Sequence, residues 1–406
     1  MTAGARQRRL GQPLGARARM LFPLALMVSV SVLFALVWQS VGDQSDYARS
    51  ERDGVRYIQA LGPLEIALTN AESAAVKGAP APREPLTRAI EAVALVDKEL
   101  RDQLRTQDRW AELRTKIESL PASGSSTAIS TAYGGANDLL LALMDKVRNT
   151  SKLIRDPDAD TYYLEDGAAQ ELPEGIVAGA RYTDLLASVA GKSPAEQAKA
   201  VIDISSAKSD LASNAKDLSD DVRLAVEESD GGSLGTTLLS KLDRFNRSVD
   251  NLVPLMAPLQ AGNGRIDAAK VTAGRDEMQA AAADLSASLL TQIDAALRDR
   301  LSSLSHRRLL AVGILVVSVL LVFAPMGLAV AAQRRKGGTT REPGRPATPP
   351  QGPAHQAPAH PAPAYQAPGY QAQAQADPAP AAWPAPGPRD ASDSEYARWE
   401  RFGASQ

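Results

Sequence analysis

The chain has 406 residues, a formal net charge of −2 and no cysteine, so it offers no disulfide framework and no thiolate for catalysis or zinc binding. It contains only three histidines, and aromatic residues make up 4% of the composition. This composition leaves no Ser–His or metal–His site to assemble and is unlike that of a protein that stacks nucleic-acid bases. We therefore expect no catalytic residues, no metal site, no cofactor and no nucleic-acid partner.

Two uncharged stretches, residues 20–42 and 309–333, predict transmembrane helices in contact with membrane lipid. At about 1.5 Å rise per residue, each can cross a hydrocarbon core of roughly 30 Å. The first stretch follows a basic segment, residues 1–19, and a cleaved signal peptide is the alternative interpretation. Its apolar part is longer than that of a usual signal peptide, which favours a membrane anchor.

The charges beside the two stretches predict an orientation. Five arginines and no acidic residue lie in residues 1–19, and Arg334, Arg335 and Lys336 follow the second stretch. Because positive flanks stay in the cytoplasm, both termini are expected there and residues 43–308 outside. Residues 43–306 hold 41 acidic and 30 basic side chains, which disfavours binding to phosphate-rich surfaces.

The apolar positions of the outer segment repeat at helical spacing. One seam comprises Tyr57, Leu61, Leu64, Leu68, Ala71 and Ala75, and another runs from Leu238 to Leu259. Alternating steps of three and four place apolar residues on one helix face. We expect an all-α fold: an elongated antiparallel helical bundle of about seven helices, as one long module or two stacked four-helix-type modules. Its first and last helices should continue into the membrane, the first with a kink at Gly62-Pro63.

The segment from Asp156 to Leu164 (DPDADTYYL) has three aspartates at alternate positions, as calcium loops do. The glycine and the bidentate glutamate of that pattern are replaced by Thr161 and Gly167. Helix capping by Asp156, with Pro157 at the first helical position, is the preferred interpretation.

The run RDPDADTYYLEDGAAQELPEG at residues 155–175 resembles a stretch of the extracytoplasmic sensor domains of bacterial chemoreceptors and sensor histidine kinases. Residues 54–68 and 109–120 are weaker matches, and together the three cover about residues 50–190. The resemblance implies a four-helix-bundle or nitrate-sensing type of module between two membrane helices. Residues 334–406 show no HAMP linker, phosphoacceptor histidine or nucleotide loop, so signalling through a separate partner protein is expected.

A membrane-anchored sensor is the leading functional hypothesis: the outer domain would bind a small anionic or amino-acid-like ligand, or a partner, and would act as a homodimer. Arginines and tyrosines suit anions in a helical groove. The candidate ligand contacts are Arg52, Arg56, Tyr57, Tyr162, Tyr163 and Arg181. The alternative is a membrane-anchored scaffold that recruits partners through its tail.

The tail, residues 334–406, is rich in Pro, Ala and Gln. From residue 337 on it has no Ile, Leu, Val or Met and holds 14 of the 27 prolines, which predicts disorder. A short helix is expected near residues 392–402, with Tyr396, Trp399 and Phe402 on one face as candidate partner contacts.

Overall fold

The computed structural model describes residues 15–156, 158–229, 232–260 and 265–336, and within these ranges all regular structure is helical. The α-helices are α1 (Gly15–Val76), α2 (Arg83–Leu104), α3 (Gln107–Glu118), α4 (Ser126–Ser151), α5 (Ala159–Asp166), α6 (Leu172–Val189), α7 (Pro194–Glu228), α8 (Gly232–Leu252), α9 (Ala257–Gln260) and α10 (Ala268–Lys336). Short 3-10 turns, η1 (Leu153–Arg155) and η3 (Val253–Met256), and a π-helical turn, η2 (Gly167–Glu171), join some of them. The all-α expectation is confirmed.

Helices α1 and α10 contain 62 and 69 residues and each includes one of the two apolar stretches without a break. Both are long and apolar enough to cross a membrane. Apolar side chains of these stretches are exposed, for example Leu33 at 61% and Leu321 at 70%. Exposed apolar surface of this extent is typical of contact with lipid. The predicted continuity of the first and last helices with the apolar stretches is confirmed, and α1 runs unbroken through Gly62 and Pro63.

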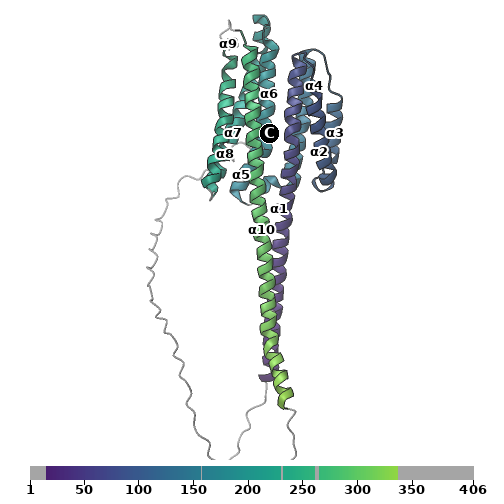
Figure 1. The fold of residues 1–406 in the computed structure, drawn as a ribbon, viewed down its shortest axis with the longest axis vertical. Helices are drawn as coiled ribbons and strands as arrows, with labels where there is room; N and C mark the ends of the chain where they lie inside the picture. The colour runs from purple at the N-terminus through teal and green to yellow at the C-terminus, as the bar shows by residue number, and fades with distance from the viewer. Residues whose placement is uncertain (1–14, 157, 230–231, 261–264, 337–406) are drawn as a thin grey trace, which may run out of the picture. The chain divides into compact units, whose positions relative to one another are not determined.

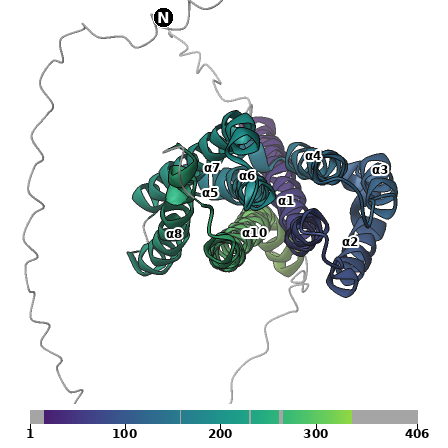
Figure 2. The same cartoon turned by 90° about the horizontal axis from the view of Figure 1, so that it is seen from above.

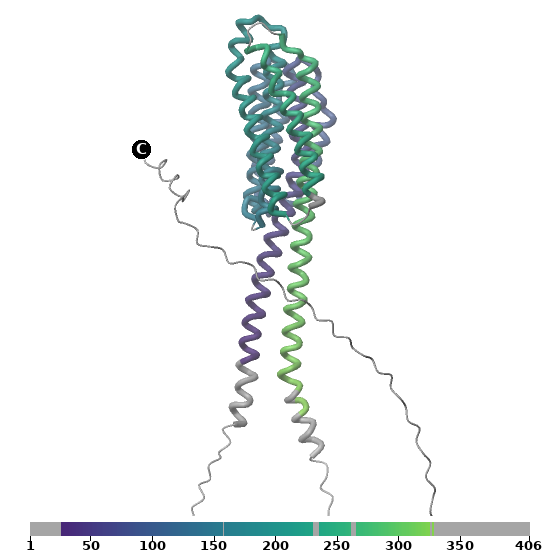
Figure 3. The backbone as a smooth tube through the Cα atoms, turned by 90° about the vertical axis from the view of Figure 1, so that its left-hand side faces the viewer, coloured from purple at the N-terminus to yellow at the C-terminus, as the bar shows by residue number. Residues whose placement is uncertain are grey.

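Helices α1 and α10 run side by side in opposite directions and extend beyond the other helices (Figures 1 and 3). Seen from above, α2, α3 and α4 lie on one side of α1, and α7 and α8 lie on the other side of α10 (Figure 2). Helix α6 contacts α1, α7 and α10. The two helices that carry the apolar stretches are therefore also the centre of the packed helices.

The predicted apolar seams form the core. Tyr57, Leu61, Leu64 and Leu68 on α1 are fully buried, as is Leu297 on α10. Burying such side chains stabilises a fold by roughly 1.5–3 kcal/mol each. The seams of neighbouring helices meet because a repeat of threes and fours keeps one face of each helix turned toward its partner.

A short break separates α2 from α3. Helix α2 ends at Leu104, and Arg105 adopts a left-handed conformation with φ of 53°. Thr106 next to it donates a hydrogen bond of 2.7 Å to the buried Asp97 carboxylate, which also accepts one of 2.8 Å from Tyr57. These bonds stabilise a break that no glycine or proline in the sequence signalled.

Some expectations concern residues outside the described ranges. Most of the tail, residues 337–406, lies there, and so do the helix near 392–402 and its contacts Tyr396, Trp399 and Phe402. Residues 1–14 of the basic N-terminal segment lie there as well.

Candidate functional site at the base of the helical domain

Arg300 of α10 connects the first and last helices with the DPDADTYYL segment. Its Nη1 lies 3.3 Å from Glu51 Oε2 on α1, and its Nη2 lies 2.6 Å from Asp156 Oδ1 and 2.6 Å from Asp158 Oδ2. Arg300 precedes the apolar stretch of α10 by nine residues, or about 14 Å of helix. We call Arg300, Glu51, Asp156 and Asp158 the Arg300 clamp.

The local backbone explains why the two aspartates reach α10. Helix α4 ends at Ser151, the φ of 74° at Lys152 turns the chain sharply, and the turn Leu153–Arg155 follows. Asp156 Oδ1 then accepts a 2.8 Å bond from the backbone N–H of Asp158, and α5 begins at Ala159. The capping prediction is wrong in detail: α5 begins at Ala159 and the residue before it is Asp158, so Asp156 bonds a backbone N–H of the preceding turn and does not cap the helix.

Tyr47 of α1 holds this turn against the first helix. Its hydroxyl donates a 2.5 Å bond to the carbonyl of Arg155 and lies 3.3 Å from that of Lys152. The Lys152 ammonium lies 4.6 Å from the centre of the Tyr47 ring, within the range of a cation–π contact. Burial raises the pKa of the Tyr47 hydroxyl to about 12, so it acts as a hydrogen-bond donor at neutral pH.

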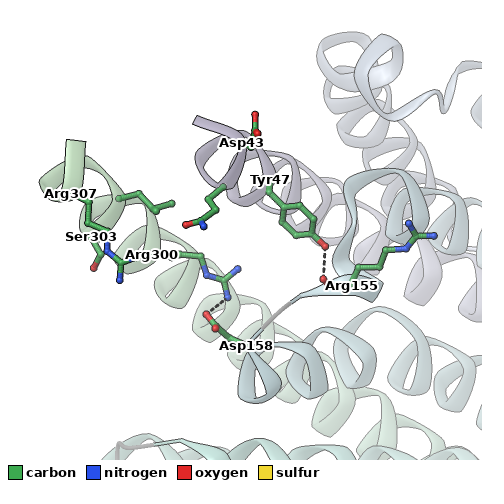
Figure 4. Close-up of a pocket in the computed structure, with 9 residues that line it drawn as sticks. Asp43, Tyr47, Arg155, Asp158, Arg300, Ser303 and Arg307 are labelled. Carbon is green, nitrogen blue, oxygen red and sulfur yellow. Dashed lines mark hydrogen bonds and ion pairs between the residues drawn. The ribbon is translucent and has the colours of Figure 1, made fainter. Parts of the chain in front are cut away.

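Tyr47 and Arg300 line a pocket of about 600 Å³ between α1, α10 and the turn before α5 (Figure 4). Arg155, Arg300 and Arg307 contribute positive charge to it, and Asp43 and Asp158 contribute negative charge. Just beyond it, the Arg308 guanidinium lies 5.5 Å from the ring centre of Trp38, which joins α10 to α1 at the start of the apolar stretches.

Two of the predicted ligand contacts, Arg52 and Arg56, line one groove of about 440 Å³ between α1 and α10. Arg49 and Arg298 line it too, so four arginines face only two aspartates, Asp53 and Asp294. Arg52 Nε lies 2.8 Å from Asp294 Oδ1, and Arg298 pairs with the same carboxylate. Arg56 pairs with Glu99 at 2.5 Å, where both side chains are more than half exposed. We call this the arginine groove.

The other predicted contacts lie elsewhere. Tyr57 is fully buried and bonds Asp97, so it is a core residue. Tyr162 and Tyr163 are partly buried on α5, with ring centres 5.4 Å apart. Arg181 is exposed on α6. The predicted set therefore does not form a single site.

The sequence interpretation missed a row of buried acidic residues on α1. Glu51, Glu65 and Glu72 are each no more than 4% exposed and are separated by 14 and 7 residues. Multiples of seven recur on the same helix face, next to the apolar seam. That spacing could have indicated that the three glutamates share one helix face beside the core. It did not predict burial, because charged residues beside an apolar seam are usually exposed to solvent.

Glu72 belongs to a buried polar network at the far end of the domain. It accepts a 3.0 Å bond from Asn137 Nδ2 of α4, while Arg275 of α10 pairs with Asp184 of α6 at 2.6 Å and donates a 2.5 Å bond to the carbonyl of Thr69. Burial, and next the charge of Asp184, raise the pKa of Glu72 to about 7. The network joins α1, α4, α6 and α10.

Glu65 lines a largely apolar cavity of about 550 Å³ formed by residues of α1, α4, α6 and α10. It is 1% exposed, and its Oε1 has no hydrogen-bond partner among the described residues. Burial raises the pKa of Glu65 well above its usual range.

Comparisons with family models, curated proteins and solved structures found no match to this chain.

Proposed function

We propose that this protein is a membrane-anchored sensor in which movement of α1 against α10 carries a signal across the membrane. In this proposal residues 20–42 and 309–333 span the bilayer, both termini are cytoplasmic, and the packed helices form an extracytoplasmic antiparallel bundle. The basic residues beside each apolar stretch support the orientation. The resemblance of residues 155–175 to bacterial chemoreceptor and sensor kinase domains supports the function.

The observation that carries the proposal is the Arg300 clamp. One guanidinium contacts Glu51 of α1 and two aspartates of the turn before α5, on a helix that continues unbroken into the second apolar stretch. A rigid helix transmits an axial shift or a rotation over its whole length, so a change at the clamp reaches the other end.

The arginine groove is the best-supported place for an input ligand. Four arginines line it between the same two helices. Among the described residues, Arg49 and Arg56 are more than half exposed and pair only with exposed carboxylates outside the lining, Asp46 and Glu99. Guanidinium groups bind carboxylates and similar anions through paired N–H donors. A small anion, or an amino acid held by its carboxylate, would contact both α1 and α10 and change their relative position.

The proposal is tested on the full chain in nanodiscs with a pair of spin labels. Because the chain has no native cysteine, Ser40→Cys on α1 and Ser305→Cys on α10 give two unique labelling sites, both exposed. The distance between the labels is measured with nitrate, succinate, glutamate and glycine in turn. We expect at least one of them to shift the distance distribution.

The shift should depend on the groove. Arg52→Gln combined with Arg56→Gln should weaken the apparent affinity at least about tenfold, because each charge-assisted hydrogen bond contributes roughly 1.5–3 kcal/mol. Arg88→Gln is the matched control, since Arg88 is an exposed arginine on α2 that pairs only with Glu84 among the described residues. A distance that none of the four probes changes would refute the sensor proposal and favour the scaffold alternative.

A further inference from the structure

Three buried carboxylates lie close together beside Arg300: two belong to the Arg300 clamp and one does not. They come from three separate places in the sequence. Glu51 lies on α1, Asp156 in the turn before α5, and Glu165 on α5 itself. One oxygen of each lies within 4.8 Å of the others. Glu51 and Glu165 are 0% and 1% exposed, and the Asp156 side chain is also fully buried.

Each of the three carboxylates has at least one buried oxygen without a hydrogen-bond partner among the described residues. Arg300 binds Oε2 of Glu51 and Oδ1 of Asp156, which leaves Glu51 Oε1 and Asp156 Oδ2 unbonded by any described residue. Glu165 is the most conspicuous, because both of its oxygens are buried and neither has a hydrogen-bond partner in the described part of the chain. A buried polar group without a partner costs roughly 1–3 kcal/mol, and more when it is charged.

The charges of this cluster do not balance among the described residues. When all are ionised, Glu51, Asp156, Asp158 and Glu165 carry four negative charges, and Arg300 is the described cation in direct contact with three of them. Lys152 acts on Glu51 only through its longer-range field. Burial raises the pKa of Glu165 to about 11 and, together with the charge of Asp156, that of Glu51 to about 8. Either protons or a cation must therefore neutralise the cluster.

We propose that Glu51, Asp156 and Glu165 form a binding site for a divalent cation that prefers oxygen ligands, such as Ca²⁺, Mg²⁺ or Mn²⁺. All donors are carboxylate oxygens, which hard cations prefer over softer metals. The separation of the donors matches oxygens that share one ion, since Ca²⁺–oxygen distances are about 2.3–2.6 Å. Arg300 binds one oxygen of Glu51 and one of Asp156 and so orients both side chains.

This site differs from the calcium loop considered in the sequence. That pattern takes its ligands from alternate positions of a single loop that begins at Asp156, and it fails at Thr161 and Gly167. Here only Asp156 is shared, and the other two ligands come from α1 and from the second turn of α5. The proposal thus departs from the expectation of no metal site, which rested on the absence of cysteine, the few histidines and the spacing after Asp156.

A bound cation would fasten α5 and its preceding turn to α1, next to the apolar stretch. The inference goes beyond the proposed sensor function and does not depend on it, because cation binding is measured without any signalling readout.

The test uses the full-length protein in nanodiscs, freed of metal with a chelator. Binding of Ca²⁺, Mg²⁺ and Mn²⁺ is measured by titration calorimetry, with bound Mn²⁺ counted by electron paramagnetic resonance. We expect saturable binding of one ion per chain for at least one of the three, and a higher melting temperature in its presence.

Glu51→Gln and Glu165→Gln keep the shape of the side chain and should each weaken binding at least tenfold. Glu65→Gln is the matched control, because Glu65 is another buried, incompletely bonded glutamate on the same row of α1 but lies outside the cluster. It should bind the ion as the unmodified protein does. Circular dichroism confirms that each variant remains helical.

Two results would overturn the inference: no saturable binding of any of the three ions to the unmodified protein, or binding that Glu51→Gln and Glu165→Gln leave unchanged. The first would mean that protons neutralise the carboxylates. If a variant failed to fold, Glu165→Asp, which keeps the charge but shortens the side chain, should fold and bind more weakly, and unchanged binding by it would count against the site.

Discussion

The contact of α1 with the end of α4 depends on a residue without a side chain. A Cβ atom on Gly54 would lie 2.2 Å from Ser151 Oγ, 2.4 Å from Ser151 Cβ and 2.9 Å from Leu153 Cδ1. Ser151 Cβ is fixed to the α4 backbone, so the clash cannot be relieved by rotating a side chain. Gly54→Ala therefore requires the two helices to separate or the turn before Asp156 to shift.

Gly62→Ala on the same helix is the matched comparison, since nothing lies within 4 Å of its Cβ position. Replacing Gly by Ala within a helix stabilises it by about 0.8–1 kcal/mol at either position. This gain cancels when the two variants are compared. The difference that remains is the steric cost, about 1–3 kcal/mol for overpacking and at the upper end here because of the short contacts.

Thermal unfolding of the full chain, followed by circular dichroism, measures the difference. About 3 kcal/mol corresponds to a melting temperature of Gly54→Ala roughly 6–12 °C below that of Gly62→Ala. Adding Ser151→Gly to Gly54→Ala removes the two shortest contacts and should restore most of the loss. Equal stability of the two alanine variants would refute the close approach of α1 and α4.

Three further predictions concern the buried polar groups. The pKa of Glu72 is raised to about 7 in the folded protein, so the folded state keeps a proton that the unfolded state releases above pH 4.5. The free energy of unfolding should therefore fall by up to about 3 kcal/mol between pH 5 and pH 8. Glu72→Gln should remove that part of the pH dependence in denaturant titrations, and an unchanged slope would contradict the assignment. Arg275→Met should destabilise the protein by about 3–5 kcal/mol because it leaves Asp184 buried without its partner, and adding Asp184→Leu should recover most of the loss in the same assay. Tyr47→Phe should cost about 1 kcal/mol and speed amide hydrogen exchange at residues 153–156, where the hydroxyl now bonds backbone carbonyls; unaltered exchange there would show that Tyr47 does not hold the turn.

The helical seams and the two apolar stretches were predictable because they are local. A repeat of threes and fours such as Tyr57, Leu61, Leu64 and Leu68 gives a helix one apolar face, whatever packs against it. A stretch without charge is recognisable by its length alone. The break at Arg105 was not predictable, because it is stabilised by bonds to Asp97 from Thr106 and Tyr57 rather than by a turn residue.

The candidate site was predictable only in part. The DPDADTYYL segment stood out in the sequence, and Arg52 and Arg56 do share a groove. Nothing local connects Arg300 to Glu51, 249 residues away, or to Asp156, 144 residues away. Sequence periodicity thus determined which residues form helices and which faces are apolar. Only the packing of those helices brings four carboxylates and one arginine together. The free energy of a buried charge depends on the protein groups that replace the water around it, and those groups come from distant parts of the sequence.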